Sequence, residues 1–193
     1  FEQNGIPTPA HEILRKGQAR SLKLPVVVKP IRQGSSLGVC CVFQESEWAK
    51  ALDQAVAYDG EALVEAFIPG HELTISIVGD EVLPVIEIRA PNGFYDYKAK
   101  YTKGLTEYLV PAPISAASAR ECQMLALKTF QALNCAGMGR VDIRMTEDGS
   151  LYVLELNNIP GFTETSLMPK AAQAAGMAFP DLCDRIMSMA KVH

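Results

Sequence analysis

The sequence predicts a mixed α+β fold with antiparallel sheets, divided into two lobes. Short apolar strands alternate with helical patterns, and several strands are joined by tight hairpins. The dipeptides Gly79-Asp80 and Asp148-Gly149 mark two such turns. Ile68-Pro69-Gly70 interrupts the pattern and predicts the connection between lobes. We therefore expect a small lobe at residues 1–67 and a large lobe at residues 68–193.

Composition excludes several classes of partner. The net charge is −4 and no basic run is present, which argues against nucleic acid. No apolar stretch reaches the roughly 18 residues of a membrane span, and we expect no signal peptide. The five cysteines lack CxxC spacing, as is typical of reduced thiols. We expect a cytoplasmic protein without a membrane partner. The sequence begins with residues typical of a helix end, followed by a glycine that would cap the helix and a proline that would stop it. We therefore also expect the chain to be part of a longer protein.

The small lobe has three predicted strands and one helix. The strands are expected at residues 25–30, 39–43 and 62–67, where apolar runs are bounded by turn residues. A helix over residues 47–58 carries an apolar stripe of Trp48, Leu52 and Val56, with Ser46 as its N-cap.

The large lobe begins with a hairpin formed by strands 72–78 and 81–87. Residues 91–110 show no clear periodicity, and a long loop of this kind in a compact domain is usually functional or disordered. A helix capped by Ser118 is expected to run to residue 133, and two more at 167–175 and 180–191 close the chain.

A second hairpin, with strands 139–145 and 151–157, has the most informative pattern. A two-residue type I′ turn at Asp148-Gly149 sets its register. The resulting apolar face consists of three pairs: Met145 with Tyr152, Ile143 with Leu154, and Val141 with Leu156.

The other face of this hairpin places Asp142 opposite Glu155, and Arg140 opposite Asn157. Like charges directly across an antiparallel pair are destabilising. Two interpretations stay open: a solvated edge with ordinary surface charges, or a divalent cation held by the two carboxylates and the Asn157 oxygen.

The loop at residues 34–38, Gly-Ser-Ser-Leu-Gly, could turn backbone N–H groups and the hydroxyls of Ser35 and Ser36 toward anionic oxygens. It could equally be a simple turn. Lys29, at the end of an apolar strand, is either a phosphate-binding ammonium or a lysine that extends to solvent. Glu65 and Glu72 flank the lobe connection, where they are either edge charges or nucleotide contacts.

Five segments together resemble the D-alanine–D-alanine ligases, which have the ATP-grasp fold: VVVKPIRQGSSLGV, EALVEAFIPGHELT, FYDYKAKYTKG, GMGRVDIR and LYVLELNNIPGFTETSLMP. The resemblance runs from about Gly5 to the C-terminus. It implies two lobes, each with an antiparallel sheet and helices, that clamp ATP. It also implies ATP-dependent joining of two D-alanines through a D-alanyl phosphate, for peptidoglycan precursors.

The resemblance implies a role for each matching residue. The implied ATP contacts are Lys29, Lys100 and Ser36 for the phosphates, Glu65, Ala66, Phe67 and Ile68 for adenine, and Glu72 for ribose. The implied ligands of two Mg²⁺ ions, with Mn²⁺ as a substitute, are Asp142, Glu155 and Asn157. The implied catalytic groups are Arg140 and the Gly161 N–H for the oxyanion, with Ser35 and Tyr101 orienting the amino acids and the mobile loop. Ser166 and Leu167 would hold the carboxylate of the second D-alanine.

The chain also departs from the family pattern. The family has an N-terminal domain whose glutamate holds the first D-alanine, and an ATP-contacting lysine just before the matching segment; both are missing here. We expect the first-substrate site to be incomplete, this chain to bind Mg–ATP weakly and to ligate poorly or not at all, and the longer enzyme to be a homodimer. The alternatives are a nucleotide-binding module without ligase activity, or a ligase for another amino acid or D-lactate. The tyrosine-rich loop around Tyr101 favours the dipeptide-forming type.

Overall fold

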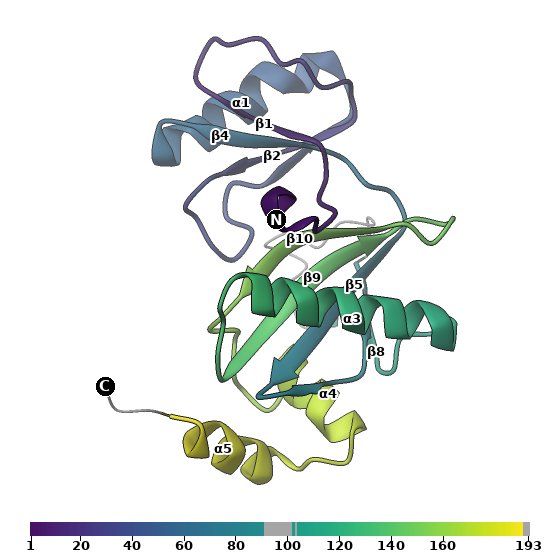
Figure 1. Ribbon diagram of the computed structural model, residues 1–193. Helices are drawn as coiled ribbons and strands as arrows, with labels where there is room; N and C mark the ends of the chain where they lie inside the picture. Colours follow the sequence, from purple (N-terminus) through teal and green to yellow (C-terminus); the bar gives the residue numbers. More distant parts are fainter. Residues whose placement is uncertain (91–101, 103, 191–193) are drawn as a thin grey trace. The chain divides into compact units, whose positions relative to one another are not determined.

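The computed structural model describes residues 1–90, 102 and 104–190. The chain divides into two compact units (Figure 1). The four-stranded unit contains Pro9–Ile68 and the described residues between Ala90 and Thr106. The six-stranded unit contains Phe1–Thr8, Pro69–Arg89 and the described residues from Glu107 onward. The sequence-based division between residues 67 and 68 differs from these units in two ways. It leaves residues 1–8 with the small lobe, and it leaves Ile68 and the described residues between Ala90 and Thr106 with the large lobe.

The four-stranded unit is an antiparallel sheet in the order β1-β4-β2-β3, with one helix packed on it. Its elements are β1 (His11–Leu14), β2 (Val26–Pro30), β3 (Cys40–Val42), α1 (Glu45–Asp59) and β4 (Ala62–Ala66). Val26, Val28 and Val64 are fully buried, and Leu52 and Ala55 of α1 belong to the same core. Strand β1 was not predicted, because only four residues pair and its sequence, His-Glu-Ile-Leu, has no clear alternation.

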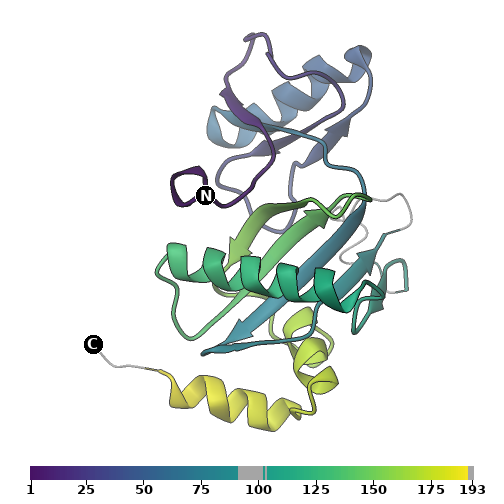
Figure 2. The same ribbon diagram turned by 45° about the vertical axis from the view of Figure 1, so that its right-hand side comes forward.

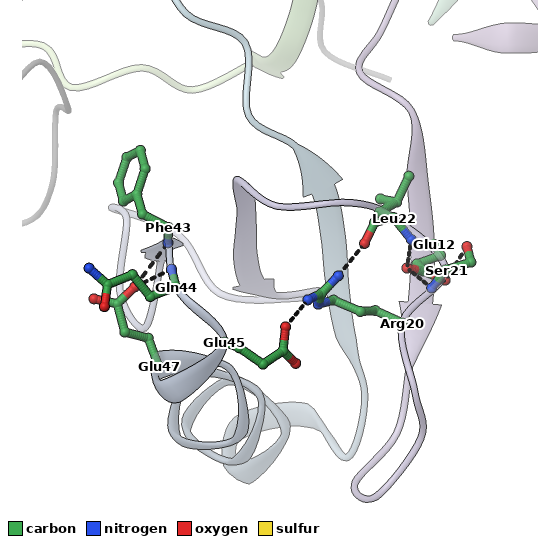
Figure 3. A network of polar contacts seen from close by, with 8 residues as sticks. All are labelled: Glu12, Arg20, Ser21, Leu22, Phe43, Gln44, Glu45 and Glu47. Atoms are coloured by element: carbon green, nitrogen blue, oxygen red, sulfur yellow. Dashed lines mark hydrogen bonds and ion pairs between the residues drawn. The ribbon is translucent and has the colours of Figure 1, made fainter.

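Helix α1 begins at Glu45, two residues earlier than the predicted Ser46 cap allows. Its N-cap is Gln44, and the Glu47 carboxylate accepts hydrogen bonds from the N–H groups of Phe43 (2.9 Å) and Gln44 (3.0 Å) (Figure 3). A glutamate at the third helical position therefore closes the helix start, as in a capping box.

The segment between β1 and β2 is fixed to the sheet and to α1 by a polar network (Figure 3). The Glu12 carboxylate accepts from the backbone N–H groups of Ser21 (2.9 Å) and Leu22 (3.1 Å). The Arg20 guanidinium donates to the Leu22 carbonyl, pairs with Glu45 and lies over the Trp48 ring, 5.4 Å from its centroid. These contacts hold the chain that enters β2, the strand that carries Lys29.

The six-stranded unit is an antiparallel sheet in the order β10-β9-β5-β7-β8, with β6 paired to β5. Its described strands are β5 (His71–Val78), β6 (Glu81–Val82), β7 (Ile86–Arg89), β8 (Glu107–Leu109), β9 (Met138–Met145) and β10 (Leu151–Asn157). Its described helices are η1 (Glu2–Asn4), α3 (Ala116–Ala132), α4 (Leu167–Ala174) and α5 (Phe179–Ser188). The predicted strand 81–87 is thus two strands. The cap of α3 is Ser115, whose hydroxyl accepts from the Ser118 N–H, and not Ser118 itself.

Helix α3 lies across β9 and β5 and covers one face of this sheet (Figures 1 and 2). Cys122, Ala126 and Phe130 of the helix share a core with every second residue of the strands, including Leu73 and Ile143. Because side chains alternate along a strand, the residues between these core positions lie on the opposite face. On β5 and β9 most of the side chains on this opposite face are polar.

The β9–β10 hairpin corrects the predicted register near its turn. The loop has three residues, 147–149: Thr146 pairs with Ser150, the Gly149 N–H donates to the Thr146 carbonyl, and Gly149 has φ +87°. The loop is therefore a type I turn followed by a left-handed residue. Consequently Val153, not Leu154, pairs with Ile143, and Met145 pairs with Leu151 rather than Tyr152.

A bulge at Leu154 then shifts the register back by one residue. Beyond it, Glu155 pairs with Asp142, Leu156 with Val141 and Asn157 with Arg140, as predicted. The polar pairs of the candidate site are thus confirmed.

Among the helices of the described ranges, none has both the length and the apolar content needed to cross a membrane.

Candidate functional site

Three rows of side chains cross strands β5, β9 and β10 on the face opposite α3. Read from β5 to β10, the rows are Ser76, Arg140, Asn157; Thr74, Asp142, Glu155; and Glu72, Arg144, Tyr152. The sequence pattern predicts the first two rows only on β9 and β10. Strand β5 supplies the first residue of each row.

The Asp142 carboxylate at the centre of this face accepts hydrogen bonds from Arg140, Thr74 and Asn157. Arg140 donates from Nε to Oδ1 (2.9 Å) and from Nη2 to Oδ2 (2.8 Å). Thr74 Oγ1 donates to Oδ1 (2.6 Å), and Asn157 Nδ2 lies 3.3 Å from Oδ2. The side chains of Arg140 and Asp142 are only 13% and 14% exposed. A guanidinium two residues away on the same strand face therefore compensates the negative charge for which sequence analysis had invoked a metal ion.

Glu155 is exposed, and its Oε1 accepts from Asn157 Nδ2 (3.0 Å). The Asn157 amide thus bridges the two carboxylates, which reduces their repulsion. Among residues 1–90, 102 and 104–190, no three His, Cys, Asp or Glu side chains gather as a metal cluster. Two carboxylates and an amide nevertheless fit Mg²⁺, which commonly binds one or two carboxylates and completes its shell with water and substrate phosphates. The amide would have to turn so that its oxygen, not its nitrogen, faces the ion.

Glu72 pairs with a buried arginine. Arg144 donates from Nη1 to Glu72 Oε2 (3.1 Å) and from Nη2 to the Gly70 carbonyl (2.9 Å). The Arg144 residue is 7% exposed. One guanidinium therefore fixes both the carboxylate implied for ribose and the backbone two residues before it.

Gly161, Ser166 and Leu167 lie together where the loop after β10 enters α4. A Cβ atom on Gly161 would stand 3.7 Å from Ser166 Oγ. Ser166 is the N-cap of α4, yet the third helical residue is Pro169, which has no N–H for a capping hydroxyl to bind. The Ser166 hydroxyl instead accepts from the Thr163 N–H (3.0 Å). Leu167 is the first helical residue, and the N–H groups there have no partner within the helix, which suits a carboxylate ligand.

In the four-stranded unit, Lys29 of β2 forms an ion pair with Glu65 of β4, with Nζ 2.6 Å from Oε2. The Lys29 side chain is 21% exposed and the Glu65 side chain 8%. Each residue lies between core positions of its strand, so the pair is on the face away from α1. The ammonium that was predicted to contact phosphate is therefore held by a carboxylate.

The backbone after Glu65 is partly committed to the sheet. The Ala66 N–H donates to the Ala10 carbonyl (2.8 Å) and the Phe67 N–H to the Pro25 carbonyl (3.1 Å). These two N–H groups are therefore not free to bind adenine. The Phe67 ring packs edge-on against Phe43, with centroids 5.3 Å apart.

The glycine–serine loop has an unusual backbone. Ser35 and Ser36 have φ values of 56° and 58°, and the Leu37 N–H donates to the Gly34 carbonyl (3.1 Å). Positive φ at both central residues defines a type I′ turn, which glycine and asparagine favour. Serine in this conformation is strained, and strain of this kind is concentrated at ligand-binding sites.

The structure distributes the predicted residues over both units. Lys29, Ser35, Ser36, Glu65, Ala66, Phe67 and Ile68 belong to the four-stranded unit, and Glu72, Arg140, Asp142, Glu155, Asn157, Gly161, Ser166 and Leu167 to the six-stranded unit. Lys100 and Tyr101 lie outside the described residues. Two residues of this face, Thr74 and Arg144, were not among the predicted site residues. A signal for Thr74 exists, because polar residues at 72, 74 and 76 alternate with apolar ones at 73, 75 and 77.

The cysteines do not form part of this face. All five are free thiols, and burial raises the pKa of the Cys122 thiol to about 11, so it is protonated at neutral pH.

Comparison with known proteins gives a consistent result. The family model described as D-ala D-ala ligase C-terminus matches residues 1–188. A protein named D-alanine–D-alanine ligase from Syntrophotalea carbinolica is 45% identical over 193 residues, which cover 98% of this chain and 63% of the relative. The chain thus spans less than two thirds of the length of that relative.

Two solved structures extend the comparison. The VanG D-Ala:D-Ser ligase from Enterococcus faecalis superposes with a TM-score of 0.85 at 32% identity, over 97% of this chain and 58% of that one. A D-alanine–D-alanine ligase from Bacillus anthracis, complexed with ATP, gives a TM-score of 0.81 at 31% identity, over 97% and 62%.

Proposed function

Because the chain belongs to the D-alanine–D-alanine ligase family and matches the C-terminal part of its members, we propose that it is the ATP-grasp part of a ligase that joins two D-alanines. ATP phosphorylates the carboxylate of one D-alanine, and the amine of the second attacks the acyl phosphate. The observation that supports this best is the row Thr74, Asp142, Glu155 beside Arg140. It concentrates hard oxygen ligands and one guanidinium on one sheet face, which is what phosphoryl and acyl transfer need.

Each residue has a distinct role in the proposal. Asp142, Glu155 and Asn157 hold Mg²⁺, which, when bound, neutralises phosphate charge and orients the phosphates. Arg140 and the Gly161 N–H stabilise the oxyanion at the acyl centre, where one donor is worth about 3 kcal/mol in other enzymes. Ser166 and the Leu167 N–H receive the second D-alanine carboxylate.

The ATP contacts are assigned to Lys29, Ser36, Glu72 and Lys100, with residues 65–68 at the adenine. The Lys29–Glu65 pair supports this assignment, because a lysine held by a carboxylate is already oriented before phosphate arrives. Ser35 and Tyr101 orient the amino acids and the mobile loop. The further proposals are a cytoplasmic location, because peptidoglycan precursors are built there, and a homodimeric longer enzyme.

The test is an assay of the protein as its gene encodes it. Wild type is expected to release phosphate from Mg–ATP only when D-alanine is present and to yield D-alanyl-D-alanine. Glu155→Gln should fold normally but lose turnover, because one metal ligand becomes a neutral amide. D-alanine-independent ATP hydrolysis, or equal turnover by both proteins, would contradict the proposal and favour a nucleotide-binding module.

A second candidate is a ligase that accepts a different second substrate. The observation in its favour is the likeness to a D-Ala:D-Ser ligase, whose TM-score is 0.85. The same assay with D-serine or D-lactate added to D-alanine separates the two. We expect the D-alanine dipeptide to dominate, and a mixed product in excess would favour the second candidate.

A further inference from the structure

We propose that Thr74 is the positioning residue for Asp142: its hydroxyl fixes the carboxylate so that Oδ2 faces the β10 side, where Glu155 and Asn157 lie. This inference rests on the proposed function and extends it, because none of the comparisons assigns a role to Thr74.

The hydrogen bond from Thr74 is short and protected. Thr74 Oγ1 lies 2.6 Å from Asp142 Oδ1, within the range of a hydroxyl bonded to a charged carboxylate. Thr74 is 1% exposed, so water does not compete for the bond. The two residues are also direct partners across β5 and β9, so the sheet holds their backbones in place.

The two oxygens of Asp142 face different neighbours. Besides the Arg140 guanidinium, which donates to both oxygens, Oδ1 accepts from Thr74 on the β5 side and Oδ2 from Asn157 on the β10 side. A carboxylate turns about one bond, so a bond that fixes Oδ1 also fixes Oδ2. Glu155, the other predicted metal ligand, is the β10 partner of Asp142. The Thr74 bond therefore helps to keep Oδ2 on the side of the strand where the second predicted ligand lies.

Thr74 differs from the other donors to Asp142 in what it can do during a reaction. Arg140 is also assigned to the acyl centre, so its guanidinium is shared between Asp142 and the proposed substrate. Asn157 must turn its amide if its oxygen is to bind a cation. Thr74 has no second assigned role and is buried, so its hydroxyl can stay on Oδ1 throughout. Partners of this kind orient metal ligands, and their removal typically lowers metal affinity by about 10–100-fold.

The chain offers a matched control at Ser76. This residue lies two positions further along β5 on the same face, is also 1% exposed, and its hydroxyl has no hydrogen-bond partner. Loss of the Ser76 hydroxyl therefore removes a buried polar atom from the same strand without removing a bond to Asp142.

The experiment titrates Mn²⁺ into the chain in the presence of ATP and measures free Mn²⁺ by electron paramagnetic resonance. Thr74→Val should weaken Mn²⁺ binding by about 10–100-fold. Thr74→Ser, which keeps the hydroxyl, and Ser76→Ala should bind like wild type. Circular dichroism and urea unfolding check the fold, and Thr74→Ala replaces the valine variant if the latter does not fold.

Wild-type affinity in Thr74→Val, or an equal loss in Thr74→Val and Ser76→Ala, would overturn the positioning role. Glu155→Gln is the separate control for the proposed function. If Glu155→Gln also bound Mn²⁺ like wild type, the metal site itself would be wrong. If Glu155→Gln lost Mn²⁺ binding while Thr74→Val did not, only the role proposed for Thr74 would be wrong.

Discussion

Arg140 holds both oxygens of Asp142, with Nε 2.9 Å from Oδ1 and Nη2 2.8 Å from Oδ2. The pair is mostly buried, and Asp142 faces a second carboxylate, Glu155, across the hairpin. The guanidinium therefore compensates the same negative charge that a bound divalent cation would compensate. This relationship gives Arg140 two roles, one in the stability of the sheet face and one at the proposed acyl centre.

The first prediction follows because Arg140 and a bound cation would compensate the same negative charge. Arg140→Met should lower the free energy of unfolding at pH 7 by about 3 kcal/mol, because a mostly buried carboxylate loses its cationic partner. Mg²⁺ should raise the melting temperature of this variant more than that of wild type, since the cation replaces the lost charge. Thermal unfolding with and without Mg²⁺ measures both. An equal Mg²⁺ effect on the two proteins would show that Arg140 and the cation act on different charges.

Much of this site could be predicted from alternation along two strands. The pairs Asp142–Glu155 and Arg140–Asn157 were correct, but two errors cancelled to make them so. The turn was taken as two residues, whereas Thr146 bonds Ser150 across three. The bulge at Leu154 then restored the register. Neither feature has a clear signal in one sequence, because Asp-Gly suits both kinds of turn.

Other parts of the site depend on contacts that alternation does not specify. The bonds from Thr74 to Asp142 and from Arg144 to Glu72 join β5 and β9, which lie far apart in the sequence. Pairing between distant strands is decided by packing of the whole sheet. For the same reason the ion pair of Lys29 with Glu65 was missed, although both residues had been identified.

The second prediction concerns Lys29. Lys29→Met should destabilise the protein by about 3 kcal/mol, because Glu65 keeps a buried charge without its partner. The double variant Lys29→Met/Glu65→Gln should recover most of this loss, since no charge remains to be paired. A double-mutant cycle by urea unfolding gives the interaction energy. Additive effects of the two substitutions would mean that the ion pair does not form in solution.

The third prediction concerns the strained loop. Ser36→Gly should leave stability within about 1 kcal/mol of wild type, because glycine relieves the strain of φ 58° but adds freedom to the unfolded chain. ATP affinity should fall about fivefold if the lost hydroxyl made one hydrogen bond to phosphate. Isothermal titration with Mg–ATP measures the change. Unchanged affinity would show that the Ser36 hydroxyl does not bind phosphate and that only the loop backbone can do so.

The fourth prediction is a pH dependence. Burial alone would raise the pKa of Glu87, but hydrogen bonds from His71 and Arg89 outweigh it and hold the pKa below its ordinary value of 4.5. A carboxyl whose pKa is depressed in the folded state stabilises the protein above its unfolded pKa. That contribution is lost as the pH falls through the lower, folded value.

Glu87→Gln should therefore destabilise the protein at pH 7, and the difference from wild type should shrink as the pH falls below 4.5. Urea unfolding of both proteins across the acid range measures this. A difference that stays constant with pH would assign the effect to packing rather than to charge.

The last prediction concerns Gly70, which begins the chain segment leading to Glu72. Gly70 has φ +116°, and a Cβ atom there would stand 2.1 Å from the Met145 carbonyl oxygen. Gly70→Ala should therefore cost more than about 3 kcal/mol, because two backbones must separate. It should also weaken Mg–ATP binding, since Arg144 anchors both the Gly70 carbonyl and Glu72. Gly149→Ala is the control: its φ is +87° with no atom within 4 Å, so only the backbone strain of about 1–2 kcal/mol applies. Equal losses in the two variants would show that strain, not the close approach to Met145, decides the cost.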